Sequence, residues 1–357
     1  MNDLGGHNPD DNEPISGDAV WYGQDMVHRT DWIHSLSNVE IAEIESAIAH
    51  VRSQNLDIIE VRKDDFPLPT LRRALARARQ DLVDGRGFSL IRGIPVDRWS
   101  TEDIGLAFWG IGRYVGEAIM QNRKGHVLGH VTDIGVDPTN PRFRGYQSAA
   151  ELIPHTDIAS DLVALLCLRP AKSGGLSMIA SASAIHNEIL YQRPDLIREL
   201  MRPFHIDRRE EIPNGKAPYY KLPVFNRYQG KTTVCYIRRF IESAQRFDEV
   251  PRLTDAQIDA MDMIDELAQS DAIRLEMDFQ PGDIQIVNNL TTLHARTAYQ
   301  DWPELERRRH LLRLWFAVPE GWPLPPDYFE RYEADAHGRP RGVTIPGVEP
   351  VASLNPL

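Results

Sequence analysis

The chain has 357 residues, of which 42% are hydrophobic and 26% are charged, as is ordinary for a soluble globular protein. A formal net charge of −12 argues against a surface that binds nucleic acid or an anionic membrane. The two cysteines, Cys167 and Cys235, lie inside apolar runs, so we expect buried reduced thiols and not a disulfide.

The N-terminus is polar and has no apolar segment typical of a signal peptide. No run reaches the ~18 consecutive apolar residues of a membrane span, so we expect a cytoplasmic protein without a membrane partner. Residues 1–17 have too little apolar content to pack and are expected to form a flexible N-terminal arm. Residues 18–357 show no repeat or linker and are expected to form a single domain. The oligomeric state stays open, and a homo-oligomer is among the options.

The N-terminal third is expected to be largely helical. A capping box starts at Ser37 and is followed by apolar residues at helical spacing. Residues 70–84 indicate a second helix, and Ser100 is expected to cap a third. Between these helices, residues 87–93 indicate a short strand that enters the core.

Residues 118–150 mix short apolar pieces with turns. A long connection inside a compact domain is often functional, so we expect a lid-like insertion over about 118–150. His126 and His130 lie here at a spacing that would suit a helical metal pair. Gly125 and Gly129 argue against a helix, and no nearby ligand completes a metal site.

The strongest candidate site contains His155 and Asp157, which precede the apolar run Leu162–Leu168. On a strand, side chains two residues apart share a face, so this imidazole and carboxylate would form half of a metal site. Such a pair also occurs by chance and does not establish a site alone. The best third ligand is His294, which by itself could equally be a core imidazole. Two histidines and one carboxylate, with the other positions open, are typical of non-haem Fe(II) oxygenases.

Three further segments accompany these ligands. Ser177 follows a pair of glycines, where its hydroxyl could stabilise a turn or bind a ligand. Helices are expected over residues 183–200, broken at Pro194, and over residues 254–269.

An arginine-rich strand is expected downstream of His294, in the segment ERRRHLLRLWF. Arg309 and Arg313 would share one face of this strand, and each guanidinium offers a planar fork that can bind a carboxylate bidentately. Arg307 and Arg308 are expected to lie on a solvated edge.

The segments HTD, RPAKSGGLS, PGDIQIVNNLTTLHARTAY and RRHLLRLWF resemble, in this order, the taurine dioxygenase/TfdA-like family of Fe(II)/2-oxoglutarate-dependent dioxygenases. The resemblance extends from about Gly87 to Leu324. It implies an α+β fold with a β-rich core, a double-stranded β-helix (jelly roll) flanked by helices.

The resemblance also implies a mechanism. Fe(II) would be bound by His155, Asp157 and His294. The co-substrates would be O2 and 2-oxoglutarate, which chelates the iron through its keto-acid end. Decarboxylation to succinate and CO2 would be coupled to oxidation of an unactivated C–H bond, by hydroxylation, desaturation or ring closure.

Further residues receive roles from the same resemblance. Arg313 would bind the far carboxylate of 2-oxoglutarate, assisted by Ser177 and Arg309. The partner would be a small anionic or amino-acid-like substrate, contacted by Glu151, Arg144, Arg296 and Tyr219.

Two other classes of protein remain open at this point. A metal-dependent hydrolase could use a zinc-bound water at the same three ligands. A cupin-type metal-binding protein could share the jelly roll, but it would not need an arginine at position 313.

Overall fold

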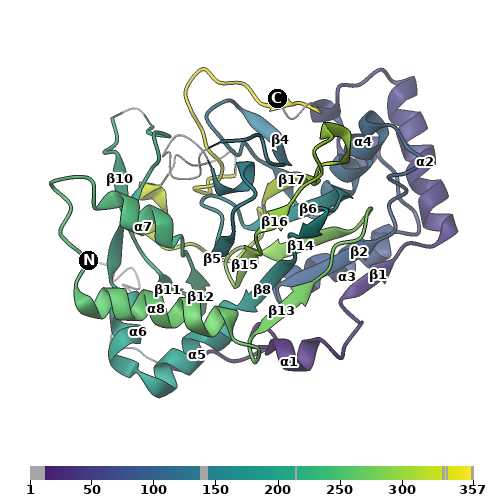
Figure 1. The fold of residues 1–357 in the computed structure, drawn as a ribbon. Helices are drawn as coiled ribbons and strands as arrows, with labels where there is room; N and C mark the ends of the chain where they lie inside the picture. Colours follow the sequence, from purple (N-terminus) through teal and green to yellow (C-terminus); the bar gives the residue numbers. More distant parts are fainter. Residues whose placement is uncertain (1–12, 137–143, 214, 332–333, 335–336, 355–357) are drawn as a thin grey trace.

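Two β-sheets face each other in the computed structural model, which describes residues 13–136, 144–213, 215–331, 334 and 337–354 (Figure 1). The larger sheet has eight strands and is antiparallel except where β1 pairs with β2 and β18 with β4. Its order is β1 (Ile33–Ser35), β2 (Phe88–Arg92), β14 (Ile284–Asn288), β6 (Leu162–Arg169), β17 (His310–Ala317), β4 (His126–Val131) and β18 (Val351–Ala352), with β3 (Glu117–Ala118) also paired to β17.

The smaller sheet is antiparallel and carries His294 and His155 on two neighbouring strands. Its order is β13 (Arg274–Met277), β8 (Ser177–Ser181), β15 (Thr292–Arg296) and β5 (Leu152–His155). Three two-stranded ladders lie outside these sheets: β9 (Pro203–Asp207) with β10 (Tyr219–Pro223), β11 (Phe225–Tyr228) with β12 (Lys231–Val234), and β7 (Ser173–Gly174) with β16 (Tyr299–Gln300).

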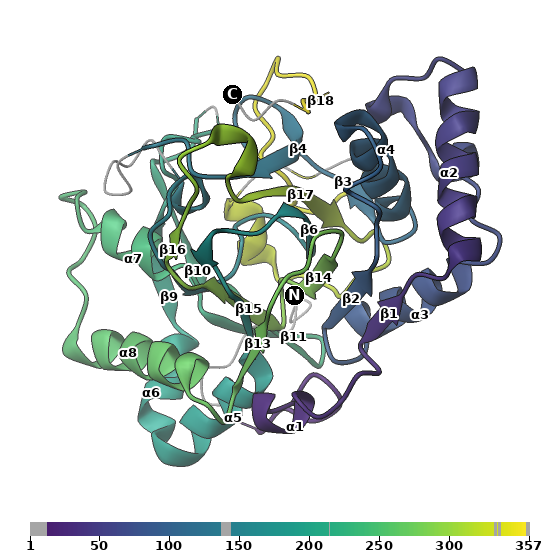
Figure 2. The same cartoon turned by 45° about the vertical axis from the view of Figure 1, so that its right-hand side comes forward.

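Helices cover the outer faces of both sheets (Figure 2). Those beside the larger sheet are α2 (Asn38–Ser53), α3 (Arg72–Val83) and α4 (Thr101–Gly112). Those beside the smaller sheet are α5 (Ala182–Gln192), α6 (Pro194–Leu200) and α8 (Asp255–Gln269). The remaining elements are α1 (Gly23–Met26), α7 (Arg238–Ala244) and the 3₁₀ turns Ile58–Glu60, Lys63–Asp65, Gly145–Gln147, Leu305–Arg307 and Pro326–Glu330.

The predicted helices form because their ends are capped as the sequence indicates. The Ser37 hydroxyl accepts a hydrogen bond from Glu40 N, and Thr254 caps α8 in the same way. Pro194 ends the helical hydrogen bonding of α5 and becomes the first residue of α6. No described helix has both the length and the apolar character to cross a bilayer.

Strand β6 shows why the core is a two-sided layer. Leu162, Ala164 and Leu166 pack with the helices beside the larger sheet, whereas Val163 and Cys167 pack between the sheets. Burial on both faces explains the uninterrupted apolar run in the sequence. Strand β17 alternates in the same way, so residues on its inner face project into the space between the sheets. The fold is the jelly roll flanked by helices that the sequence analysis expected.

Two regional expectations need adjustment. The expected insertion over 118–150 includes β4, which pairs with β17, so residues 126–131 belong to the larger sheet and the lid role of the other residues stays a prediction. Residues 137–143 of that part lie outside the described residues. Most of the expected N-terminal arm, residues 1–12, also lies outside them, while Ile15 forms two hydrogen bonds with the Asn187 side chain on α5.

Candidate active site

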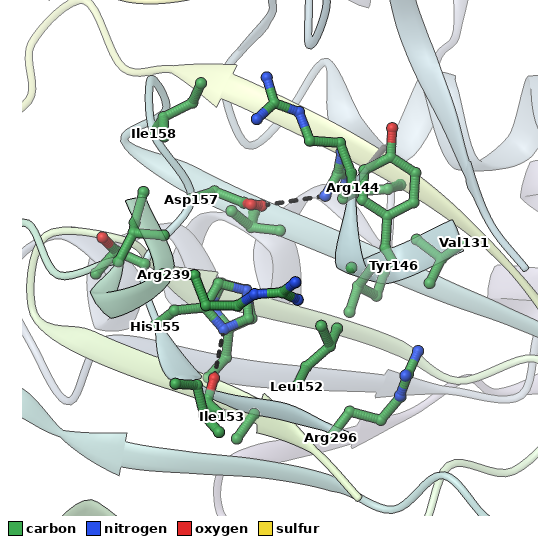
Figure 3. Close-up of a pocket in the computed structure, with 18 of the residues that line it drawn as sticks. Val131, Arg144, Tyr146, Leu152, Ile153, His155, Asp157, Ile158, Arg239 and Arg296 are labelled. Atoms are coloured by element: carbon green, nitrogen blue, oxygen red, sulfur yellow. Dashed lines mark hydrogen bonds and ion pairs between the residues drawn. The ribbon is translucent and has the colours of Figure 1, made fainter. Parts of the chain in front are cut away.

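The two histidine ligands meet because β5 and β15 are antiparallel neighbours. His155 and His294 are directly paired across these strands, and their ring centroids lie 4.4 Å apart. One side-chain donor atom from each histidine and one from Asp157 lie within 4.8 Å of one another. Figure 3 shows His155 and Asp157 on the wall of the cavity that these residues line.

Each imidazole is in the state that a metal requires. His155 Nδ1 lies 2.7 Å from Ile153 O, a contact that fixes the ring and directs Nε2 away from the backbone. His294 Nδ1 is buried and has no hydrogen-bond partner. Burial lowers the pKa of His155, and burial together with the neighbouring His155 lowers the pKa of His294 to about 3. Both rings are therefore neutral near pH 7, as metal ligands must be.

The expectation that His155 and Asp157 lie on one strand was wrong, because Asp157 lies outside β5. Strand β5 ends at His155, because the next amide, Thr156 N, donates to Tyr236 O instead of continuing the ladder with β15. Asn289 then fixes the backbone of Asp157: its Oδ1 accepts from Asp157 N and its Nδ2 donates to Asp157 O, both at 2.7 Å. The amide side chain replaces the missing strand neighbour.

The carboxylate of Asp157 is held in its charged form. Burial alone would raise its pKa, but the positive charge of Arg313 and a hydrogen bond from Trp315 lower it below the usual value. Trp315 Nε1 donates to Asp157 Oδ2 at 2.6 Å, and Arg313 Nη1 lies 3.5 Å from the same oxygen.

These residues fit Fe(II). Two neutral imidazoles and one carboxylate, placed on one side of a cavity, are the donor set of non-haem iron oxygenases. The buried, unpartnered Nδ1 of His294 is a donor atom that a metal could use, and the hydrogen bond from Trp315 to Asp157 fits a site in which supporting groups orient the ligands.

Arg313 lies at the iron end of the cavity. Its Nε donates to Gln121 Oε1 at 2.8 Å, and Gln121 Nε2 returns a hydrogen bond to Arg313 O at 2.9 Å. The guanidinium carbon lies 4.4 Å from the centre of the Tyr146 ring. These contacts and the proximity to Asp157 fix the guanidinium beside the metal ligands.

A second group of polar residues lies further along β15. Arg296 is two residues after His294, which on a strand corresponds to about 7 Å. Ser177 pairs with Arg296 across β8 and β15, and all of these residues line the cavity with Arg309. Arg309 Nη1 is buried without a hydrogen-bond partner, as are Nε and Nη1 of Arg296. Unsatisfied buried guanidinium groups are costly, and they indicate a place where an anion binds.

A glycine gives Arg309 the room that it needs. Gly175 has φ +73°, and a Cβ at this position would lie 3.1 Å from Arg309 Nε. The glycine pair in the sequence therefore supports both the turn and the approach of the guanidinium.

The cavity has a volume of about 360 Å³. Of the expected substrate contacts, Glu151, Arg144 and Arg296 line it. Tyr219 does not, because β10 turns its ring toward His205 and Phe247, with centroids at 5.5 and 5.6 Å. That prediction was wrong.

Several residues of the site were missed in the sequence. Trp315 could have been found, because it is two residues from Arg313 on the same strand and so shares its face. No comparable sequence pattern marks the other missed residues, because their positions depend on contacts between distant segments. These residues are Gln121, Arg209, Arg239 and Asn289.

Comparisons with known proteins agree with this geometry. Residues 52–315 match the model of the family described as "Taurine catabolism dioxygenase TauD, TfdA family". The FR-33289 synthase of Streptomyces rubellomurinus is 31% identical over 319 residues, covering 88% of this chain and 93% of that protein. A taurine hydroxylase-like protein of Stachybotrys chartarum is 30% identical over 323 residues, covering 87% and 82%.

A solved structure supports the fold. An asparagine oxygenase in complex with Fe(II), 3-hydroxyasparagine and succinate has a TM-score of 0.61 at 18% sequence identity, with 80% of this chain and 94% of that chain covered. The hydrolase and cupin alternatives lose their support, because the matched family consists of oxygenases. The chain belongs to the TauD/TfdA family and is a non-haem oxygenase that depends on Fe(II), 2-oxoglutarate and O2.

Proposed function

We propose that this protein oxidises an unactivated C–H bond of a small anionic substrate and releases succinate and CO2. The observation that carries the proposal is the cavity itself. One end is formed by His155, Asp157 and His294, and a second part of the wall carries buried guanidinium groups. A co-substrate with a metal-binding keto acid at one end and a carboxylate at the other matches this arrangement.

The far carboxylate of 2-oxoglutarate is assigned to Arg309, with Ser177 and Arg296 beside it. The unpartnered Arg309 Nη1 and the distance of about 7 Å between His294 and Arg296 along β15 support this assignment. Arg313, the residue expected from the sequence to bind this carboxylate, is less suitable. Its Nη1 lies 3.5 Å from Asp157 Oδ2, and its Nε donates a hydrogen bond to Gln121. We assign to Arg313 the role of stabilising the Asp157 carboxylate.

Bound iron, with O2 and 2-oxoglutarate, supplies the oxidising chemistry. The chain contributes positioning and exclusion of water. Trp315 and Asn289 hold Asp157, and Ile153 O holds His155. Apolar side chains line the cavity between the polar groups and limit access of water to the reacting centre: Val131, Leu152, Ile158, Val163 and Phe279. Hydroxylation, desaturation and ring closure are all compatible with this arrangement.

Succinate formation tests the proposal. Purified enzyme should convert 2-oxoglutarate to succinate with Fe(II) but not with Zn(II), and small organic anions should stimulate the rate above the uncoupled level. Stimulation by neutral or cationic compounds alone would contradict the proposed substrate class. Metal-dependent hydrolysis without consumption of 2-oxoglutarate would contradict the proposed reaction.

A further inference from the structure

Residues 145–151, which we call the wall segment, form one side of the cavity. Tyr146 and Glu151 of this segment line it. The centre of the Tyr146 ring lies 4.4 Å from the guanidinium carbon of Arg313, which itself lies beside Asp157. The position of the wall segment therefore helps to define the space that is left for a substrate beside the metal ligands.

Three successive carbonyl groups tie the wall segment to strands β15 and β16. Arg296 Nη2 on β15 donates to Ser148 O at 3.0 Å and also to Ala150 O. Between them, Ala149 O accepts a hydrogen bond from Tyr299 N at 3.1 Å. One arginine side chain thus supplies two of the three bonds that hold this part of the wall.

The rest of the Arg296 guanidinium can bind a second partner. A guanidinium has five N–H donors, and the two on Nη2 account for the bonds to Ser148 and Ala150. Nε and Nη1 are buried and have no hydrogen-bond partner among the described residues. Burial and the nearby charge of Arg309 lower the pKa of Arg296 to about 10. An anion at Nε and Nη1 would offset both the missing hydrogen bonds and the repulsion between the two arginines.

Arg309 provides a further donor in the same part of the cavity. The guanidinium carbons of Arg296 and Arg309 lie 4.6 and 5.2 Å from the centre of the Tyr299 ring. Arg309 Nη1 is also buried without a partner in the described part of the chain. Ser177 pairs with Arg296 across β8 and β15 and lines the cavity with both arginines. To this group of residues we assign the far carboxylate of 2-oxoglutarate.

Given the function proposed above, we propose that Arg296 is a positioning residue that couples the binding of 2-oxoglutarate to the placement of the wall segment. Nε and Nη1 bind the carboxylate of the co-substrate, while Nη2 holds Ser148 and Ala150. The carboxylate compensates the buried charge and fixes the guanidinium, so the wall segment opens less often when the co-substrate is bound. By linkage, a ligand that contacts the closed wall segment binds more tightly in the presence of 2-oxoglutarate.

Hydrogen–deuterium exchange measures the opening of the wall segment. The amides of Gln147 and Ser148 donate to Arg144 O and Gly145 O, so their exchange reports the loss of this turn. Anaerobic protein loaded with Fe(II) would be compared with and without saturating 2-oxoglutarate. In the unmodified protein, we expect 2-oxoglutarate to slow exchange in the wall segment by at least about fivefold and to leave α2 unchanged.

Two lysine variants show whether Arg296 carries the coupling. Arg296→Lys keeps the charge on a single nitrogen that cannot hold the carbonyl groups and the carboxylate together, so 2-oxoglutarate should no longer slow exchange. Arg309→Lys is the matched control, since it changes the same part of the cavity without touching the wall segment. At 2-oxoglutarate concentrations that give full charge-transfer absorption between Fe(II) and 2-oxoglutarate, Arg309→Lys should retain the slowing.

Three results would overturn the proposal: unchanged exchange in the unmodified protein, slowing that persists in Arg296→Lys, or an equal loss of slowing in Arg309→Lys. The comparison in the unmodified protein decides the matter even if Arg296→Lys does not fold. The charge-transfer absorption separates this proposal from the proposed function. Its absence in the unmodified protein would contradict the proposed function, whereas its presence without slower exchange would contradict only the coupling.

Discussion

Arg309 and Arg313 lie four residues apart along one segment and have different surroundings. Arg313 is bonded to Gln121 and lies 3.5 Å from Asp157, so its charge acts on the metal ligands. Arg309 is 4% exposed and has a buried Nη1 without a partner. We therefore propose that the same residue type supports the metal site at position 313 and binds an anion at position 309.

Replacing Arg309 by lysine should weaken the binding of 2-oxoglutarate. Lysine keeps the charge but loses the planar fork, so the apparent Kd should rise by about ten- to hundredfold. Anaerobic titration of the Fe(II) enzyme, followed by charge-transfer absorption, measures this change. Arg307→Lys, at an exposed position, serves as the control and should have little effect. A larger loss in Arg313→Lys than in Arg309→Lys would return the carboxylate clamp to Arg313.

Trp315 should determine how tightly the iron is held. Trp315→Phe removes the hydrogen bond to Asp157 Oδ2 and keeps an aromatic ring. Loss of such a supporting contact typically lowers metal affinity by about 10- to 100-fold. Competition with a chromophoric Fe(II) chelator under anaerobic conditions gives the affinity. Trp302→Phe, outside the cavity, is the matched control, and equal affinities in the two variants would assign Trp315 a packing role only.

At the scale of elements, Asp161 joins the segment between β5 and β6, which contains Asp157, to the C-terminal segment that contains Arg339 and Arg341. Its carboxylate accepts from Val318 N at 2.8 Å, from Arg339 Nη2 at 2.8 Å and from Arg341 Nε at 2.7 Å. Its carbonyl oxygen accepts from Asn289 N at 2.8 Å. One buried residue thus connects the residue that follows β17, the segment after position 337 and the residue that fixes Asp157.

Asp161→Asn should destabilise the fold by about 3–5 kcal/mol, because removal of one partner leaves buried arginine charge without compensation. Burial alone would raise the pKa of Asp161, but Arg341 and Arg339 lower it below the usual value. A lowered folded-state pKa contributes stability above the unfolded pKa of about 4 that is lost as the pH falls below it. The difference in the free energy of unfolding between the unmodified protein and Asp161→Asn, measured with urea, should therefore be smaller at low pH than at pH 7.

The exposed carboxylate of Asp195 provides the comparison for this prediction. Asp195→Asn should leave the unfolding midpoint nearly unchanged at pH 7. If Asp161→Asn were equally harmless, the buried arginines would have to be compensated by other groups.

At the scale of the molecule, local patterns in the sequence predict the elements well. The capping boxes at Ser37 and Thr254 start helices in the structure, and the apolar run in β6 is a strand buried on both faces. The sequence could single out His294 as a candidate third ligand because it lies between two recognisable strands, and the structure brings it beside His155 and Asp157.

The remaining features depend on contacts between distant segments and leave no periodic signal. Asp157 is placed by Asn289, which follows β14, and no spacing rule connects these two residues. The cavity wall also contains arginines from three separate segments, Arg144, Arg209 and Arg239, whose meeting depends on the complete fold. Tyr219 was misplaced because alternation along a strand does not state which face of β10 meets the cavity.

Anaerobic addition of 2-oxoglutarate to the Fe(II)-loaded protein tests the central claim most directly, because the charge-transfer absorption forms only when 2-oxoglutarate coordinates the bound Fe(II). We predict that this absorption forms in the unmodified protein and in His126→Ala, whose side chain is not part of the metal-ligand group. It should be lost, together with most bound iron, in His155→Ala and in His294→Ala. Normal absorption in either of these two variants, or its loss in His126→Ala alone, would contradict the account.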